Sequence, residues 1–243
     1  MTKKYIYTSY KEAIKDLKDD SSIMIGGFGV QGGQPTNLML ALRDLNLSNL
    51  TLIGNVAGIS MVTGYGWKES DKDKIIDQSI FFKDKQVKKI ICSFPIPSSR
   101  NTLSEIEKAW INEEAEIEII PQGTLAEKIR AGGSGIPAFY TKTGVGTIVE
   151  KEKESKIING EKFLLEYALN ADVSLIKAFI SDEKGNLIYK GTSRAFNPIM
   201  ATASKLTIVE VDKIVSSKDI DPERIGTPGI YVDRIVTKNN ELS

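Results

Sequence analysis

The chain is organised around residues 23–37, IMIGGFGVQGGQPTN. The first three residues are apolar and predict a short buried strand. Five glycines follow within eight positions, and Pro35 stands where a helix would begin, ahead of the apolar residues 38–42. A glycine loop between a strand and a helix leaves backbone N–H groups accessible, because glycine has no Cβ and tolerates positive φ. The stretch therefore predicts a binding loop for a small, electron-rich ligand.

A dinucleotide-binding (NAD or FAD) module on a doubly wound fold is one interpretation, because residues 27–32 fit the pattern G-x-G-x-x-G behind a strand. That fingerprint requires an acidic residue about 20 positions further on, which holds the ribose. The next predicted strand, residues 50–53, runs into GNVAG at 54–58, which holds no carboxylate. No Gly-Lys-Ser/Thr follows the glycines, as a P-loop would need. The dinucleotide module therefore stays only as an alternative.

The composition excludes several classes of partner. Lys and Arg together number 32, as do Asp and Glu, so no net charge attracts a nucleic acid or an anionic membrane. No apolar run approaches the roughly 18 residues that cross a bilayer. The single cysteine, Cys92, cannot form an internal disulfide, which suits a reducing compartment. We therefore expect a cytoplasmic protein with no nucleic-acid or membrane partner.

The absence of histidine narrows the possible chemistry further. Without an imidazole the chain cannot build a Ser-His-Asp or Cys-His nucleophile, or a histidine metal site. Carboxylates, lysines, hydroxyls, amides and backbone N–H groups remain available for any catalysis by this chain.

Short apolar runs alternate with amphipathic stretches and predict an α/β fold, a mainly parallel open sheet covered by helices. We expect a single domain over residues 1–243, with an excursion or smaller subdomain near 66–89 and an exposed mixed-charge connection at 150–154. The predicted helices are residues 10–17, 36–45, 102–110 and 160–169. The predicted strands are residues 23–25, 50–53, 89–94, 117–120, 173–180, 187–189, 206–211 and 230–236.

Gln122 directly follows the predicted strand at 117–120. Thr124 with Glu127 three positions later fits a capping box, so we expect Thr124 to be the N-cap of a helix. The amide of Gln122 is then free to point into the edge where loops after strand carboxyl ends gather and ligands usually bind. A surface glutamine in a turn is the alternative that the pattern alone favours.

The sequence resembles the alpha (A) subunit of family I CoA-transferases, of the 3-oxoacid or acetate/butyrate type, over nearly its whole length. The resemblance depends on many short matches in the same order as in the family. The matching segments are residues 26–29, 121–127, 129–133, 135–141, 143–147, 191–192, 194, 196–198 and 227–236.

The resemblance implies ping-pong chemistry without histidine. In the family a glutamate attacks an acyl-CoA, passes through a mixed anhydride and becomes a glutamyl-CoA thioester that delivers CoA to the acceptor acid. That glutamate lies in a Ser-Glu-Asn-Gly motif of the beta subunit, and this chain has no such motif. The resemblance thus implies a separate beta subunit, in an αβ or α2β2 assembly, with coenzyme A as substrate and no metal or organic cofactor.

The resemblance also implies which residues meet the reacting groups. Gln122 matches the glutamine whose amide helps to form an oxyanion hole facing the glutamate of the beta subunit. Asn55 matches the first asparagine of Ser-Asn-Asn-Ala-Gly, and Val56 replaces the second. The residues expected to bind substrate or line the subunit seam are Gly26, Gly27, Phe28, Gly29, Gly32, Gly33, Asn55, Gly132 and Gly133.

Two other functions are compatible with the same fold. A CoA-thioester hydrolase would let water outcompete the acceptor acid, and a non-catalytic interaction protein would lack a beta partner. The sequence also leaves open which acyl groups are exchanged. Succinyl-CoA with acetoacetate, or acetyl-CoA with butyrate or acetoacetate, would fit the resemblance.

Overall fold

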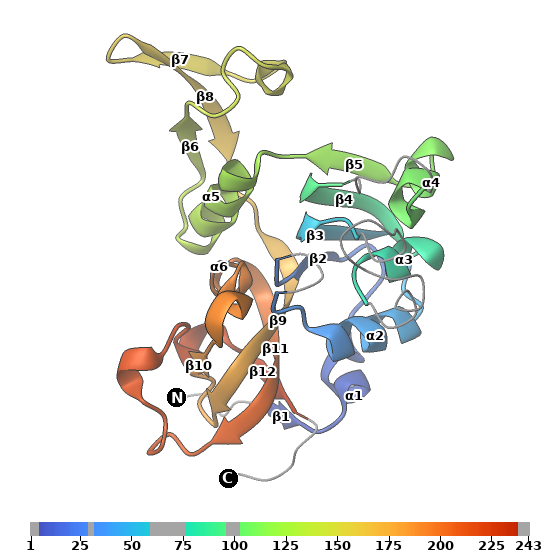
Figure 1. Cartoon of the computed structure of the whole chain (residues 1–243), viewed down its shortest axis with the longest axis vertical. Helices are drawn as coiled ribbons and strands as arrows, with labels where there is room; N and C mark the ends of the chain where they lie inside the picture. Colours follow the sequence, from blue (N-terminus) through green and yellow to red (C-terminus); the bar gives the residue numbers. More distant parts are fainter. Residues whose placement is uncertain (1–4, 29–31, 59–75, 96–102, 238–243) are drawn as a thin grey trace.

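The computed structural model describes residues 5–28, 32–58, 76–95 and 103–237 (Figure 1). Among these residues, nine strands form one sheet in the order β1-β12-β11-β9-β2-β3-β4-β5, with β10 paired to β9. Every described pair in it is parallel except β9–β10, so the predicted parallel sheet is confirmed. The strands are β1 (Tyr5–Tyr7), β2 (Ser22–Ile25), β3 (Leu50–Val56), β4 (Val87–Phe94), β5 (Glu116–Ile119), β9 (Ala171–Asp182), β10 (Leu187–Ile188), β11 (Ser204–Val215) and β12 (Arg234–Val236).

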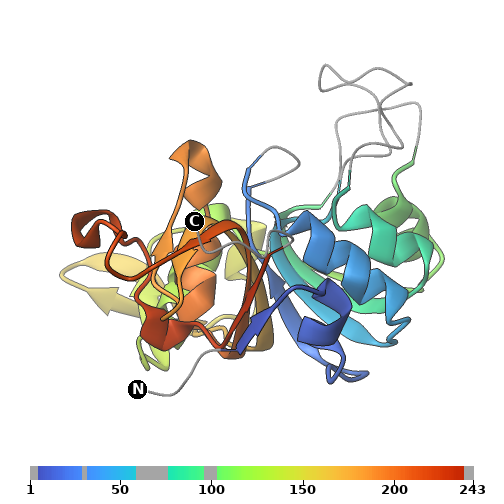
Figure 2. The same ribbon diagram turned by 90° about the horizontal axis from the view of Figure 1, so that it is seen from below.

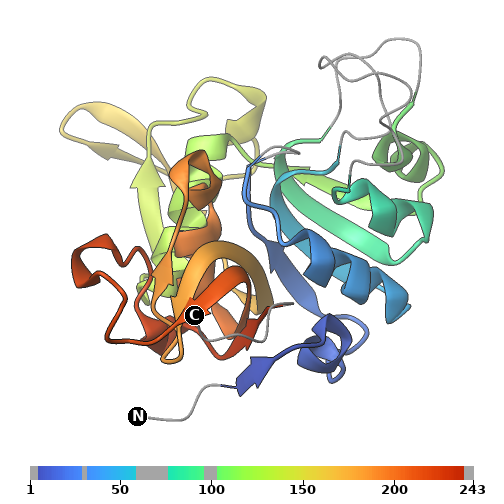
Figure 3. The ribbon, with the colours of Figure 1, turned by 60° about the horizontal axis from the view of Figure 1, so that its bottom comes forward.

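Helices cover both faces of this sheet, as expected for runs that are apolar throughout (Figures 2 and 3). The sheet has a hydrophobic core on each face, and successive side chains of β2 alternate between them. Ile23 and Ile25 point into the first core, and Met24 points into the second. The first core is closed by α1 (Tyr10–Ile14), α2 (Thr36–Asp44), α3 (Ser79–Lys83) and α4 (Glu105–Ile111). The second is closed by α5 (Gln122–Gly133) and α6 (Asn197–Thr202).

A second sheet stands out from the body beyond α5 (Figure 1). It is antiparallel, in the order β6-β8-β7, from β6 (Ala138–Thr141), β7 (Ser155–Ile158) and β8 (Glu161–Tyr167). The helix predicted over 160–169 is therefore wrong. The reason is the turn at Asn159 and Gly160, whose positive φ values of 51° and 81° close a two-residue hairpin that a helical periodicity ignores.

The remaining boundaries differ in smaller ways. The strand predicted at 230–236 is divided into η5 (Gly229–Tyr231) and the short β12. Residues 66–75 of the expected excursion lie outside the described residues, whereas Phe81 in its later part is fully buried in the body. Of residues 150–154, Glu150 ends η2 (Ile148–Glu150) and residues 151–154 connect this helix to β7. The further short helices are η3 (Gly191–Arg194) and η4 (Pro222–Arg224).

Within the described residues, no helix is long and apolar enough to cross a membrane. The expectation of a single domain over the whole chain stays a prediction.

Candidate active site

Gln122 is the first residue of α5, three positions after the end of β5. Pro121 is the N-cap, with φ −51°, and its ring fixes the backbone for the helix that follows. The expectation that Thr124 is the N-cap is therefore wrong, because Thr124 already lies inside the helix. Glu127 accordingly forms no capping box and accepts a hydrogen bond from Arg130 Nε at 2.9 Å.

Asn55 lies one residue before the carboxyl end of β3 and meets Gln122 there. Gln122 Nε2 donates to Asn55 Oδ1 at 2.7 Å. Asn55 is 4% exposed, whereas Gln122 is exposed to solvent. A methyl group built on the neighbouring Gly123 would meet no heavy atom within 4 Å, so the space beside the pair is open. The structure thus brings together two of the residues that the resemblance placed near the reacting groups.

The glycine loop lies at the same edge, after β2. Gly26 N donates to Leu175 O at 2.9 Å, and Phe28 N donates to Gly32 O at 2.7 Å, which closes the loop on itself. Gly27 has φ +102°, and a Cβ there would lie 2.5 Å from Gly32 O, so only glycine fits. Gly29 lies outside the described residues.

Asn197 fixes the glycine loop from the opposite side. Its buried side chain donates from Nδ2 to Gly33 O at 3.0 Å and to Ser193 O at 2.9 Å. A Cβ on Gly26 would lie 1.9 Å from Asn197 Oδ1, and one on Gly33 would lie 2.1 Å from Ser193 O. These two glycines therefore allow the backbone to approach Asn197 closely. The sequence alone assigned no role to Asn197, and its position before a proline at a helix start was the available signal.

The loop borders two hollows. One, of about 490 Å³, is lined by Gly32, Gly33, Lys177 and Lys190 among others. The other, of about 230 Å³, is lined by Phe28, Gly32, Thr192 and Ala195. Phe28 is half exposed and stacks on Phe196 with ring centroids 6.5 Å apart. The loop therefore presents Phe28 and Gly32 to open space at the carboxyl edge of the sheet.

Gly132 and Gly133 lie at the other end of α5 from Gln122. A Cβ on Gly132 would lie 2.4 Å from Leu169 O, and one on Gly133 would lie 2.0 Å from Thr202 Oγ1. A helix rises about 1.5 Å per residue, so α5 separates these glycines from Gln122 by roughly 15 Å. Both glycines serve the close packing of α5 against its neighbours.

The N-terminus of α2, which follows the glycine loop, holds an anion from the chain itself. Glu210 of β11 is 2% exposed and accepts hydrogen bonds from Asn37 N at 2.9 Å and Leu38 N at 3.1 Å. It also accepts one from Asn37 Nδ2 at 2.7 Å. A dinucleotide would place its pyrophosphate at this helix end. Because the Glu210 carboxylate takes that position, the dinucleotide alternative has no support.

Comparison with known proteins agrees with the resemblance found in the sequence. A family model described as Coenzyme A transferase matches residues 7–238. The probable A subunit of a succinyl-CoA:3-ketoacid coenzyme A transferase from Bacillus subtilis is 41% identical over 231 residues, covering 95% of this chain and 89% of the relative. An acetoacetyl-CoA:acetate/butyrate CoA transferase alpha subunit of Clostridium acetobutylicum is 46% identical over 220 residues, covering 90% of this chain and 92% of the relative.

Two longer proteins match this chain over part of their length. A mitochondrial succinyl-CoA:3-ketoacid coenzyme A transferase of Mus musculus is 37% identical over an alignment of 250 residues, and the alignment covers 96% of this chain and 44% of the relative. An acyl-CoA transferase structure from E. coli O157:H7 has a TM-score of 0.80 at 19% identity, covering 97% of this chain and 50% of that one. The second likeness shows the shared fold.

Proposed function

Because the chain belongs to the coenzyme A transferase family, we propose that it is the alpha (A) subunit of an enzyme that moves CoA between an acyl-CoA and a short-chain carboxylic acid. The acids include 3-oxo acids such as acetoacetate, because the names of the relatives specify 3-ketoacids, acetate and butyrate. A separate beta subunit completes the enzyme, as αβ or α2β2. The cytoplasm, which suits a chain with one cysteine, is part of this proposal.

The observation that carries the proposal is the amide of Gln122, held at the open edge of the sheet by buried Asn55. An amide nitrogen has two hydrogens, and Asn55 Oδ1 takes one. The other is available to an oxygen atom in the open space beside Gly123. A donor that is already oriented stabilises a developing oxyanion without reorganisation, which is worth about 3–4 kcal/mol of barrier.

The chemistry then follows from a carboxylate nucleophile of the beta subunit. Its oxygen attacks the thioester carbonyl of the acyl-CoA, and the tetrahedral oxyanion collapses with release of the CoA thiolate and formation of a mixed anhydride. The thiolate attacks the glutamyl carbonyl of the anhydride, which releases the donor acid and leaves a glutamyl-CoA thioester. The acceptor acid reverses both steps. Each oxyanion needs a donor, and we assign that role to Gln122.

The glycine loop supplies the remaining contacts in this proposal. Phe28 and Gly32 face the smaller hollow beside the loop, where a short acyl chain would find an apolar ring and a backbone without side chains. Gly26 and Gly33 act through the rigid anchor to Asn197 rather than through contact with substrate.

The test is CoA transfer by this chain alone and with a co-expressed beta subunit, using succinyl-CoA, acetyl-CoA and acetoacetyl-CoA against acetate, butyrate and acetoacetate. Borohydride would trap the glutamyl-CoA thioester, and mass spectrometry would locate it. We expect transfer only with both chains and the trapped glutamate on the partner. Transfer by this chain alone would overturn the proposal.

The same assay separates the other two functions. Release of free CoA at full rate without an acceptor acid would indicate a hydrolase. Assembly with the beta subunit but no transfer across the panel would favour a non-catalytic interaction protein.

A further inference from the structure

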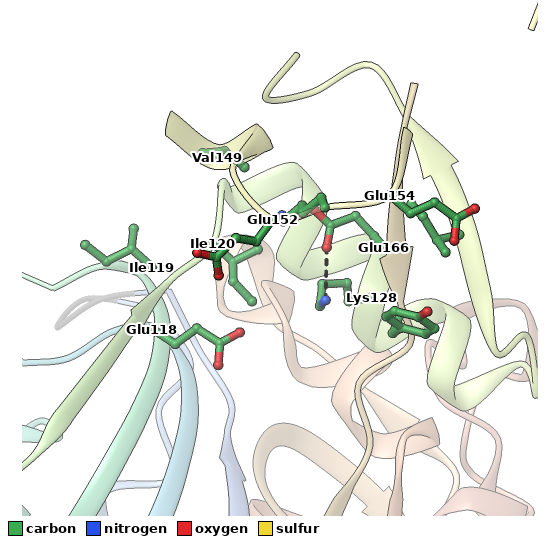
Figure 4. Close-up of a pocket in the computed structure, with 11 residues that line it drawn as sticks. Glu118, Ile119, Ile120, Lys128, Val149, Glu152, Glu154 and Glu166 are labelled. Atoms are coloured by element: carbon green, nitrogen blue, oxygen red, sulfur yellow. Dashed lines mark hydrogen bonds and ion pairs between the residues drawn. The ribbon is translucent and has the colours of Figure 1, made fainter. Parts of the chain in front are cut away.

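A hollow of about 460 Å³ separates the end of β5 from the β6-β8-β7 sheet, which we call the arm (Figure 4). One wall is formed by Glu118, Ile119 and Ile120. The opposite wall is formed by residues 165–167 of the arm and by the segment that leads into it, at residues 149 and 152–154. Lys128 of α5 lies at the base, hydrogen-bonded to Glu166. The hollow is therefore built from three elements that no local sequence pattern connects.

The rim of this hollow exposes apolar side chains that a free monomer would normally cover. Ile119 is 59% exposed on one side, and Tyr167 is 66% exposed on the other. β5 is also the last strand of the main sheet, and within the described residues its outer edge pairs with no strand. Native proteins generally cover an apolar free edge, because it would otherwise promote aggregation. These features indicate a surface made for a partner.

The lining has a net negative charge. It contains the carboxylates of four glutamates and the ammonium groups of two lysines, a balance of −2. Both lysines, Lys128 and Lys153, bind the buried Glu166. Glu152 forms no hydrogen bond or ion pair with any described residue, and it lies across the hollow from Glu118 (Figure 4). A basic side chain of the occupant would find an unpaired carboxylate there.

The hollow also borders the candidate active site, since Ile120 is followed by Pro121 and Gln122. An occupant seated against Ile120 would lie beside the amide that we assign to the oxyanion hole. The mouse relative, of which this chain spans 44%, contains a further 56% of chain (100 − 44) that this chain does not match. In a two-chain enzyme that remainder would be a separate partner of similar size.

We propose that the hollow between β5 and the arm receives the beta subunit, with Ile119 and Tyr167 in apolar contact and a Lys or Arg of the partner facing Glu152. The inference rests on the proposed function, because that function requires the partner's carboxylate beside Gln122. A second copy of this chain is a poorer occupant, since an isologous contact would bring two negatively charged hollows together.

The test measures the affinity of this chain for the co-purified beta subunit by sedimentation velocity, with Ile119→Asp and Glu152→Lys as variants. The matched controls are Ile111→Asp, at the end of α4, and Glu113→Lys, in the turn that precedes β5. Ile111 is 57% exposed, close to the value for Ile119, and Glu113 has a positive φ like Glu152, 57° against 65°. Circular dichroism and thermal unfolding of each chain alone would check that the variants fold.

We expect each variant in the hollow to raise the dissociation constant by about tenfold or more, and each control to change it by less than about twofold. Reversing one basic residue of the partner to Glu should then restore binding to Glu152→Lys. Folded variants that bind like the wild type would overturn the inference while the proposed function stands. Failure of the wild type to bind the beta subunit would overturn the proposed function itself.

Discussion

Gln122 Nε2 lies 2.7 Å from Asn55 Oδ1, so an exposed amide at the start of α5 is oriented by a buried amide at the end of β3. The two residues are 67 positions apart in the chain. Asn55 is 4% exposed and presents its acceptor to Gln122, which makes it a positioning residue for the donor. Its assignment as a direct substrate contact is therefore the weaker interpretation.

A double-mutant cycle tests this division of roles. In the reconstituted enzyme, Gln122→Ala removes the donor and should lower kcat by roughly 100- to 1,000-fold. Asn55→Ala leaves the donor unoriented and should lower kcat by about tenfold, with KM unchanged. The double variant should be no slower than Gln122→Ala, because Asn55 acts only through Gln122. Steady-state kinetics with acetoacetate as acceptor measure the four rates, and multiplicative losses would show that Asn55 acts independently.

The two glycines with similar positive φ offer a second prediction. Gly33 has φ +66° and Gly135 has φ +71°, but only at Gly33 would a Cβ meet other atoms, 2.1 Å from Ser193 O. Gly135→Ala should cost about 1 kcal/mol, the penalty of the left-handed backbone alone. Gly33→Ala should cost at least about 3 kcal/mol, because the clash adds to that penalty. Urea unfolding gives both values, and equal costs would mean that the loop moves away from Ser193 without loss.

The sequence was sufficient for the parts of the site that follow from strand order. Gln122 and Asn55 each follow or end an apolar run, and parallel strands bring such ends to one edge, so their proximity was predictable. The glycine loop was placed correctly for the same reason. These inferences need only local patterns and the handedness of the crossovers.

The parts that the sequence missed depend on contacts between distant segments. Glu210 caps α2 from 173 positions away, and Asn197 holds Gly33 across 164 positions. No local signal links such pairs. The arm was missed for a different reason, because Phe163, Leu164 and Tyr167 fit both a helical face and a strand, and only the Asn159 turn decides between them.

Asp172 gives a prediction for pH. Its carboxylate binds Lys205 Nζ at 2.8 Å and accepts from Ser22 N at 2.9 Å and Ser22 Oγ at 2.7 Å. These bonds lower the pKa of Asp172 to about 2, and the bond from Lys205 contributes most. The pKa in the folded chain lies below the ordinary value of 3.8, so the stabilisation is present above about pH 4 and is lost as the pH falls towards 2.

The variant Asp172→Asn isolates this contribution. The Lys205 side chain is 82% exposed, so solvent screening limits the difference from wild type to about 1 kcal/mol at pH 6. The difference should begin to shrink between pH 4 and pH 3, because the unfolded wild-type chain, with its Asp172 pKa near 3.8, then takes up a proton that the folded chain, with a pKa of about 2, does not yet bind. Urea unfolding at pH 6, 4 and 3 measures it. A difference that stays constant over this range would show that the ionised carboxylate is not the source.

Glu210 and Asp212 supply the last prediction, because both contact Lys177 but only Glu210 caps a helix. Glu210→Gln removes the charge at the N-terminus of α2 and at least one of its acceptors for Asn37 and Leu38. It should cost about 2 kcal/mol of unfolding free energy. Asp212→Asn, with a side chain 54% exposed, should cost less than about 0.5 kcal/mol.

Guanidinium unfolding of the two variants distinguishes the cap from the ion pair. If Glu210→Gln loses much more unfolding free energy than Asp212→Asn, the Glu210 carboxylate holds α2, and with it the glycine loop, in place. Hydrogen exchange should then show faster amide exchange in the first turn of α2 for Glu210→Gln alone, because the charged acceptor of Asn37 N and Leu38 N becomes a neutral amide. Equal losses of unfolding free energy in the two variants would assign the stabilisation to the ion pairs with Lys177. The N-terminus of α2 would then again be open to an external anion.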